Sequence, residues 1–212
     1  MARSTRFTFV FIRSCSTAWD SQDRLCGITD LPATDESLGE LTAKIQSDHP
    51  LDSLRSDMCT VLCGPSDVSL QSAKLLLRGI DSSVKVCDGL HELSFGLWEG
   101  VARSDLEERF PKVYSQWLDH PGTISPPDGE TLEVVQERVL YELSQTVGKL
   151  KTEHPVVGLV LRPFAWAVLK CWLDQRPLAQ VWSYIDSQWG MESFSMDRAA
   201  LDGLGTRLAR TA

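Results

Sequence analysis

The sequence predicts an α/β protein built around a layered sheet. Short, continuous apolar runs rich in β-branched and aromatic residues are typical of buried strands, and they occur at 7–12, 61–63, 84–87 and 156–161. Between them lie segments in which apolar residues recur at spacings of three and four, as on the buried face of a helix. Strands that alternate with helices in this way favour helices packed on a sheet.

Local signals indicate where the helices begin and end. Ser66 is a candidate N-cap for a helix that Gly79 ends, and Ser104 opens a capping-box pattern. Pro163 follows the last apolar run and is placed to open a helix that extends to 171 or 173. Further helices are expected at 111–118, 128–150 and 178–184, and a last strand at 191–196.

We expect one domain over residues 1–212. The stretch 120–129 is rich in proline and glycine, but neither side of it contains enough strands to form a sheet alone, so it is interpreted as a loop. The two ends, 1–6 and about 200–212, are poorly patterned and are expected to be mobile.

Composition and charge exclude several classes of function. The formal net charge of −8 and the pI near 5.0 give no overall attraction for nucleic acid or for an anionic membrane. No apolar run suits a membrane span or a signal peptide, so a cytoplasmic location is expected. The six cysteines are expected to be free thiols, and Cys59-x-x-x-Cys63 has no nearby partners for zinc. Any anion site must therefore be local.

Two arginines follow predicted strands. Arg13 comes directly after the run at 7–12, and Arg162 lies between the run at 156–161 and Pro163. Ligands of α/β sheets bind outside the carboxyl ends of the strands, where a helix N-terminus also attracts anions. Planar guanidinium groups suit phosphate oxygens, so a phosphate site is one interpretation. Solvated arginines, or arginines paired with carboxylates, are the alternative.

Several segments, in order, resemble motifs of the histidine phosphatase (phosphoglycerate-mutase-like) superfamily. Residues 13–20 (RSCSTAWD) resemble its Arg-His-Gly-Glu-Thr-x-Trp-Asn segment, and residues 90–100 (LHELSFGLWEG) match its Leu-x-Glu…Gly-x-Trp-Glu-Gly block. Residues 126–131 (PPDGET) resemble its Pro-Pro-Gly-Gly-Glu-Ser segment, and 156–173 align with its Ser-His-Gly strand-to-helix junction. The resemblance runs from about 7 to about 173 and implies a three-layer α/β/α sandwich with a mostly parallel sheet.

The resemblance also implies a chemistry, and this chain departs from it. In the family, a histidine becomes phosphorylated, two arginines and a second histidine hold the phosphoryl group, a carboxylate passes the proton, and no metal or cofactor takes part. Here Ser14 stands at the nucleophile position, with Cys15 in place of the following glycine. Leu70 stands at the second arginine and Arg162 at the second histidine. A phosphohistidine cannot form without the imidazole.

Two of the positions that take part in the family's chemistry keep the family's residue. Arg13 keeps the first arginine, and Glu92 keeps the acid/base carboxylate. Trp19 and Trp98 are expected to pack near the rim of the pocket. These residues lead to the first hypothesis, in which a catalytically inactive family member binds phosphate, a small phosphorylated ligand or a phosphorylated protein partner through Arg13 and Arg162.

Two other hypotheses stay open. The chain can be an unconventional phosphomonoesterase that uses Ser14 or Cys15 as nucleophile with Glu92, because a thiol beside Arg13 can have a lowered pKa. It can also be a structural or interaction protein with a vestigial pocket, including a homo-oligomer, since tryptophans favour interfaces. The tryptophans that suggest this are Trp166, Trp172, Trp182 and Trp189.

Overall fold

One five-stranded sheet, in the order β3-β2-β4-β1-β5, organises the chain. The computed structural model describes residues 6–47, 49–150, 155–186, 191–197 and 200. In the sheet, β5 is antiparallel to β1 and the other neighbouring strands are parallel, which confirms the mostly parallel sheet. The strands are β1 (Arg6–Arg13), β2 (Met58–Cys63), β3 (Ser83–Val86), β4 (Val156–Leu161) and β5 (Met191–Asp197).

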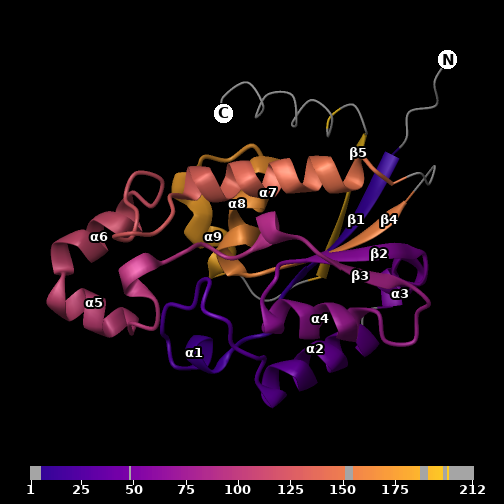
Figure 1. Cartoon of the computed structure of the whole chain (residues 1–212), viewed down its shortest axis with the longest axis horizontal. Coiled ribbons are helices and arrows are strands. Elements are labelled where there is room, and N and C mark those ends of the chain that lie inside the picture. Colours follow the sequence, from indigo (N-terminus) through magenta and orange to yellow (C-terminus); the bar gives the residue numbers. More distant parts are fainter. Residues whose placement is uncertain (1–5, 48, 151–154, 187–190, 198–199, 201–212) are drawn as a thin grey trace.

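Helices cover both faces of the sheet, so the predicted three-layer α/β/α sandwich is confirmed (Figure 1). On one face lie α7 (Leu132–Val147) and α8 (Pro163–Leu173). The other face carries α2 (Asp35–Ser47), α3 (His49–Ser56) and α4 (Asp67–Leu76). Because both of its faces are covered, the central strand β4 is buried at all six residues, which explains its uninterrupted apolar sequence.

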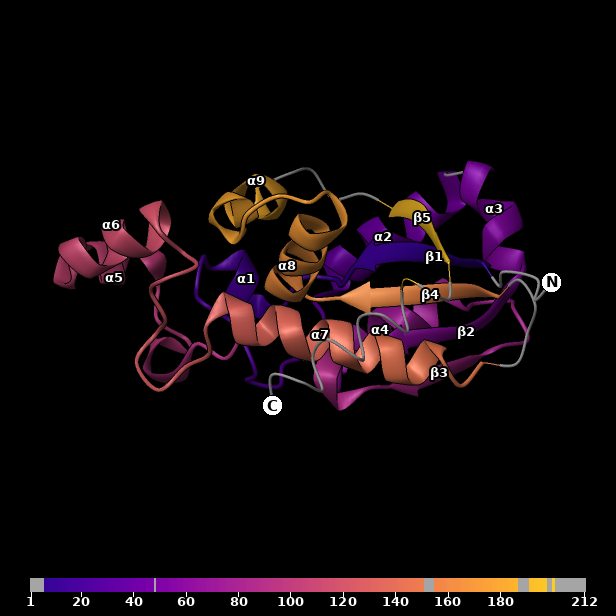
Figure 2. The same cartoon turned by 90° about the horizontal axis from the view of Figure 1, so that it is seen from above.

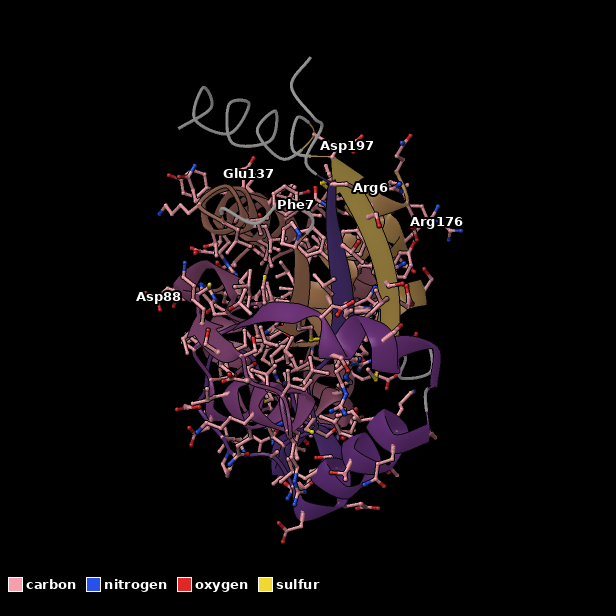
Figure 3. The ribbon with its side chains drawn as sticks, turned by 90° about the vertical axis from the view of Figure 1, so that its right-hand side faces the viewer. Arg6, Phe7, Asp88, Glu137, Arg176 and Asp197 are labelled. Atoms are coloured by element: carbon pink, nitrogen blue, oxygen red, sulfur yellow. The ribbon has the colours of Figure 1, made fainter. Side chains whose placement is uncertain are left out.

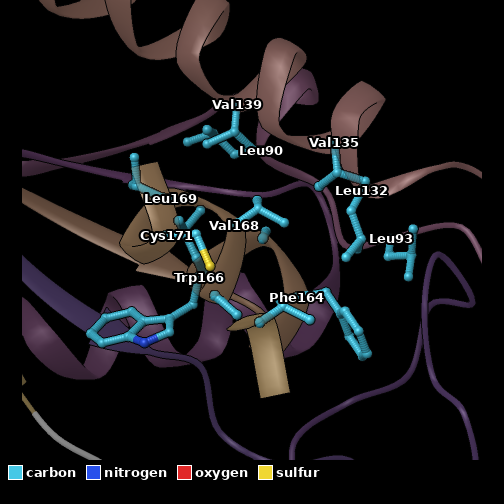
Figure 4. Close-up of a cluster of buried hydrophobic side chains, with 14 of the residues drawn as sticks. Leu90, Leu93, Leu132, Val135, Val139, Phe164, Trp166, Val168, Leu169 and Cys171 are labelled. Carbon is cyan, nitrogen blue, oxygen red and sulfur yellow. The ribbon is translucent and has the colours of Figure 1, made fainter. Parts of the chain in front are cut away.

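The face under α7 and α8 contains the larger apolar core. Figure 4 shows Val135 and Val139 of α7 turned toward Val168 and Leu169 of α8. These side chains are fully buried and belong to one cluster with Phe9 and Phe11 of the sheet. Packing against α7 fixes the position of α8, whose first residue directly follows Arg162.

The carboxyl ends of the parallel strands meet at one end of the molecule. In Figure 2 the arrowhead of β4 points toward α1 (Ala18–Ser21), α8 and α9 (Val181–Ile185). The helices α5 (Arg103–Arg109) and α6 (Pro111–Asp119) project beyond this end. At the opposite end, Arg6 pairs with Asp197 across β1 and β5 (Figure 3). Three short 3₁₀ helices complete the described elements, at Asp88–Leu90, Gly96–Trp98 and Leu178–Gln180.

Several predicted boundaries were wrong. Ser66 is the N-cap of α4, as predicted, although its side chain makes no capping hydrogen bond. The predicted end at Gly79 was wrong, because the helix ends at Leu76. The capping box at Ser104 does not form, because α5 begins at Arg103 with Ala102 as its N-cap.

The long helix and the edge strand also differ from expectation. Helix α7 begins at Leu132 with Thr131 as its N-cap, because Asp128 has φ of 57°, which an α-helix does not accommodate. Strand β3 was expected to be buried but is mostly exposed, because it lies at the edge of the sheet.

Some expectations are not tested by this structure. The predicted mobility of 1–6 and 200–212 concerns residues that lie almost wholly outside the described ranges, although Arg6 begins β1. The single-domain organisation stays a prediction. Within the described residues, no helix combines the length and the apolar character that crossing a membrane requires.

Candidate functional site at the strand ends

The structure brings the two predicted arginines to neighbouring strand ends. Strands β1 and β4 are parallel, and Arg13 lies opposite Leu161 in the register. Arg162 therefore lies one residue beyond the end of the paired segment, where it is the N-cap residue of α8. The local sequence explains the junction, because Pro163 has the fixed φ that suits the first helical position and needs no hydrogen-bond acceptor there.

Both terminal nitrogens of Arg162 donate hydrogen bonds within the protein. Its Nη1 donates to Oδ2 of Asp20 at 2.9 Å, and its Nη2 donates to Oδ1 of Asp20 at 3.2 Å. Nη2 also donates to the carbonyl oxygen of Cys26 at 2.8 Å. The side chain is only 2% exposed. Burial alone would lower the pKa of Arg162, but Asp20 raises it above the usual value, so the guanidinium stays charged.

Asp20 is held in place by the turn that precedes it. Thr17 is the N-cap of α1, and its backbone N–H and its hydroxyl both donate to Oδ2 of Asp20, at 2.7 and 2.8 Å. Burial opposes ionisation of this carboxyl, but Arg162 and the bonds from Thr17 together hold the pKa of Asp20 below its usual value. The pair is therefore a bidentate ion pair in which the carboxylate is oriented from both sides.

Of the two predicted arginines, Arg13 is the one that lines a cavity. Its Nη1 donates to the carbonyl oxygen of Ile185 in α9 at 2.8 Å, and the side chain is half-buried. It lines a cavity of about 130 Å³, which is well below the ~300–1,000 Å³ of sites for drug-sized ligands. Three arginines and three carboxyl groups border this cavity, together with Cys26, Ile185 and other residues. The charged residues are Arg13, Arg24, Arg103, Asp20, Asp23 and Glu92.

Glu92 occupies the N-terminus of helix α8. Its carboxylate accepts hydrogen bonds from the backbone N–H groups of Leu93, Phe164 and Ala165, at 2.6, 2.9 and 3.0 Å. Burial raises the pKa of Glu92 above the usual value, although Arg162 and these three N–H groups oppose the rise. The helix terminus that was expected to attract a phosphate therefore already carries a carboxyl group.

Ser14 and Cys15 are buried and are not among the described residues that line this cavity. The hydroxyl of Ser14 donates to the carbonyl oxygen of Cys15 at 3.2 Å. Cys15 packs in the apolar cluster under α2 and α4, and its thiol lies 3.5 Å from the carbonyl oxygen of Ser37. Burial raises the pKa of Cys15, so the predicted lowering of this pKa by Arg13 was wrong. Leu70 is half-buried against the same cluster, and the only basic residue in α4 is Lys74.

The two tryptophans flank the site without lining the cavity. Trp98 is buried and meets Trp117 edge to face, with ring centroids 5.6 Å apart. The ring of Trp19 lies against Gly100, where a Cβ atom would stand 2.8 Å from it and where φ of +75° also requires glycine. Among the described residues that line the cavity, the predicted site residues are therefore Arg13 and Glu92.

Sequence reasoning missed residues that shape the site. Asp20 stands where the family motif has asparagine, so the motif itself contained the signal, but the partner Arg162 is 142 residues away. Arg103 contacts Asp23, with 3.3 Å between Nε and Oδ1, and both residues line the cavity. Glu99 fixes the loop at 27–29 by accepting hydrogen bonds from Gly27, Ile28 and Thr29.

A second, larger cavity lies on the other side of Glu92. Its volume is about 550 Å³, and it contains His91, whose Nδ1 lies 2.7 Å from the carbonyl oxygen of Glu92. The described residues that border it include no arginine or lysine, so this lining does not suit an anion. In the described part of the chain, no group of three or more potential ligands is arranged to hold a metal ion. The acidic side chains in its described lining are Asp30, Asp88, Glu92 and Glu130.

The fold and this site together define an α/β sandwich with a charged pocket at the carboxyl ends of β1 and β4. Residues 9–199 match the model of the histidine phosphatase superfamily, branch 1. The chain therefore belongs to the histidine phosphatase superfamily, as the sequence motifs predicted.

Individual relatives are similar over different parts of the chain. A protein of Mycobacterium tuberculosis described as bifunctional is 33% identical over 85 residues, which are 40% of this chain and 23% of that protein. The chain thus spans less than a quarter of the length of this relative. Phosphoserine phosphatase 1 of Hydrogenobacter thermophilus is 22% identical over 175 residues, 82% of this chain and 80% of that protein. The structure of Bacillus stearothermophilus YhfR shares the fold, with a TM-score of 0.78, 20% identity, and coverage of 89% of this chain and 90% of that one.

Proposed function

We propose that this chain is a catalytically inactive histidine phosphatase homologue that binds a small phosphoryl-type anion. The observation that carries the proposal is the composition of the strand-end cavity. Its described lining contains three guanidinium groups and a buried carboxyl group but no imidazole. The phosphohistidine route needs a neutral imidazole nitrogen as nucleophile, which the described lining of this cavity does not offer.

The binding part of the proposal rests on Arg13. This guanidinium borders the cavity and has one carbonyl partner, Ile185, at 2.8 Å, which leaves donor hydrogens for an anion. Burial lowers the pKa of Arg13, while Glu92 and Asp20 raise it, and an arginine remains protonated at neutral pH in any case. The cavity volume of about 130 Å³ suits a phosphoryl group better than a whole organic ligand.

The alternative hypothesis, an unconventional phosphomonoesterase, has less support. Cys15 is buried in an apolar cluster, outside the cavity lining, and its pKa is raised. A reactive thiol needs the opposite conditions, namely access and a lowered pKa. The interaction hypothesis is also weakened, because Trp166 is buried and both Trp172 and Trp182 are partly buried against the main core. Trp189 lies outside the described residues.

Two measurements test the proposal. Purified protein is incubated with p-nitrophenyl phosphate and with phosphoserine, and phosphate release is followed; we expect no turnover above the buffer rate. Inorganic phosphate is then titrated into the wild type, Arg13→Ala and Arg6→Ala by calorimetry. Arg6 is the matched control, since it is the first residue of the strand that Arg13 ends.

We expect weak, millimolar binding that Arg13→Ala abolishes and Arg6→Ala leaves unchanged. Turnover at ~1 s⁻¹ or faster, within the ordinary range of enzymes, would falsify the catalytic part. Binding that is equal in the wild type and Arg13→Ala would remove Arg13 from the site, and the absence of binding in all three proteins would remove the binding function.

A further inference from the structure

We infer that Asp20 limits the affinity of the strand-end cavity for phosphoryl-type anions, because its carboxylate occupies the face of Arg162 that an entering phosphoryl group needs. This inference rests on the proposed binding function and names the residue that limits it. The ion pair is bidentate, with 2.9 and 3.2 Å between nitrogen and oxygen. A carboxylate and a phosphoryl group bind a guanidinium through the same paired geometry, so the two compete for one partner.

The position of Asp20 makes it an effective internal competitor. It lines the cavity together with Arg13, whereas Arg162 itself is 2% exposed and absent from the cavity lining. The carboxylate thus separates the buried guanidinium from the open space. Because it is part of the chain and is oriented by Thr17, it is present at a high effective concentration, which an external anion must overcome.

The balance of charges in the cavity lining also limits the attraction for an anion. Three guanidinium groups and three carboxyl groups line the cavity, so its formal charges cancel when all six are ionised. Glu92 already fills the N-terminus of α8, so this positive helix end offers an anion no further attraction. Replacing one oxygen of Asp20 by an amide nitrogen keeps the size of the side chain but removes the competing charge.

The test compares three proteins: the wild type, Asp20→Asn and Asp23→Asn. Asp23 lines the same cavity, and its substitution changes the local charge by the same amount. It pairs with Arg103 instead of Arg162, and its side chain is 74% exposed. Inorganic phosphate is titrated by calorimetry at pH 7, and the shift in melting temperature with phosphate concentration is measured in parallel.

We expect Asp20→Asn to bind phosphate at least about tenfold more tightly than the wild type, since a charge-assisted pair becomes available. The effect of Asp23→Asn should be clearly smaller. Equal gains in the two variants would overturn the inference, because they would reflect the general potential of the cavity. If the wild type and Asp20→Asn bind equally, the inference fails while the binding function stands. If none of the three binds, the binding function fails as well.

A second variant covers the case in which Asp20→Asn does not fold without phosphate. Thr17→Val keeps the carboxylate but removes the hydroxyl that donates to it at 2.8 Å. The hold on Asp20 weakens while Arg162 keeps its counter-charge. Tighter phosphate binding than in the wild type supports the inference, and an unchanged dissociation constant for this folded variant overturns it.

Discussion

The carboxylate of Glu92 accepts a hydrogen bond from the backbone N–H of Phe164 at 2.9 Å, across 72 residues of sequence. A second bond, from the N–H of Ala165 at 3.0 Å, completes a side-chain cap on helix α8. In the family motif this position carries the acid/base carboxylate. In this chain the carboxyl group satisfies two N–H groups that no intrahelical carbonyl can reach. Glu92 therefore has a structural role whether or not it still transfers protons.

We expect Glu92→Ala to destabilise the protein by ~2–4 kcal/mol, because it leaves buried N–H groups at the start of α8 without acceptors. Glu92→Gln should cost less, since one amide oxygen can still accept. Urea unfolding followed by circular dichroism measures both. If Glu92→Ala unfolds at the same urea concentration as the wild type, the carboxyl group is not needed as a cap.

The pH dependence of the same variant pair tests the raised pKa of Glu92. The folded state holds this pKa above that of the unfolded chain, ~4.3, so the wild type loses stability as pH rises from there through the folded pKa. Glu92→Gln cannot titrate at this position. The stability of Glu92→Gln relative to the wild type should therefore be higher at pH 7 than at pH 4. A constant difference across this range contradicts the raised pKa.

Arg138 joins the two sequence blocks that matched the family most closely. Its Nε and Nη2 donate to the Glu130 carboxylate, and its Nη1 donates to the carbonyl oxygens of Gly89 and His91. Nη2 also reaches the carbonyl oxygen of Glu92 at 2.9 Å. We expect Arg138→Lys to lose ~2–3 kcal/mol, because an ammonium group cannot make this planar set of bonds. Thermal unfolding of Arg138→Lys beside Arg109→Lys in the exposed α5 measures the difference, and equal melting temperatures would refute it.

Alkylation of the cysteines directly tests the hypothesis that Cys15 acts as a nucleophile. Cys15 is 2% exposed, whereas Cys59 is exposed on β2. Alkylation requires both an accessible sulfur and the thiolate form. Iodoacetamide at pH 8 should therefore modify Cys59 in the native protein and reach Cys15 only after unfolding. Peptide mass spectrometry identifies the sites, and rapid native labelling of Cys15 would revive the thiol hypothesis.

The fold was predictable from the sequence because its periodic signal is strong. The apolar strand at 156–161 and the helix after Pro163 both appear where expected, since burial on all sides leaves few polar residues to blur the pattern. Helix α2 was not predicted. Its buried residues are only Ser37, Leu41 and Ile45, and such a narrow apolar face is hard to separate from a polar loop.

The site was predictable only in outline. Arg13 and Arg162 were expected at neighbouring strand ends because parallel strands share one carboxyl edge, and the structure places them there. Whether a guanidinium faces open space or a carboxylate depends on a partner distant in sequence. Asp20 lies on a helix of four residues, which has almost no periodic signal, so its pairing with Arg162 was not foreseeable.

The Asp20–Arg162 ion pair should make the protein sensitive to acid. The folded state lowers the pKa of Asp20, so the pair stabilises the protein fully above the unfolded pKa of ~3.9 and loses this contribution as pH falls through the lower folded pKa. Asp20→Asn lacks the titration and removes the carboxylate that pairs with the buried guanidinium of Arg162. We expect it to be less stable than the wild type by on the order of 3 kcal/mol at pH 7, with the gap closing toward pH 2. Urea unfolding at several pH values measures the gap.

Glu92 titrates with the opposite sign, so only the difference in stability between the two proteins isolates the contribution of Asp20. A gap that does not narrow in acid would show that the Asp20 carboxylate is not ionised in the folded protein.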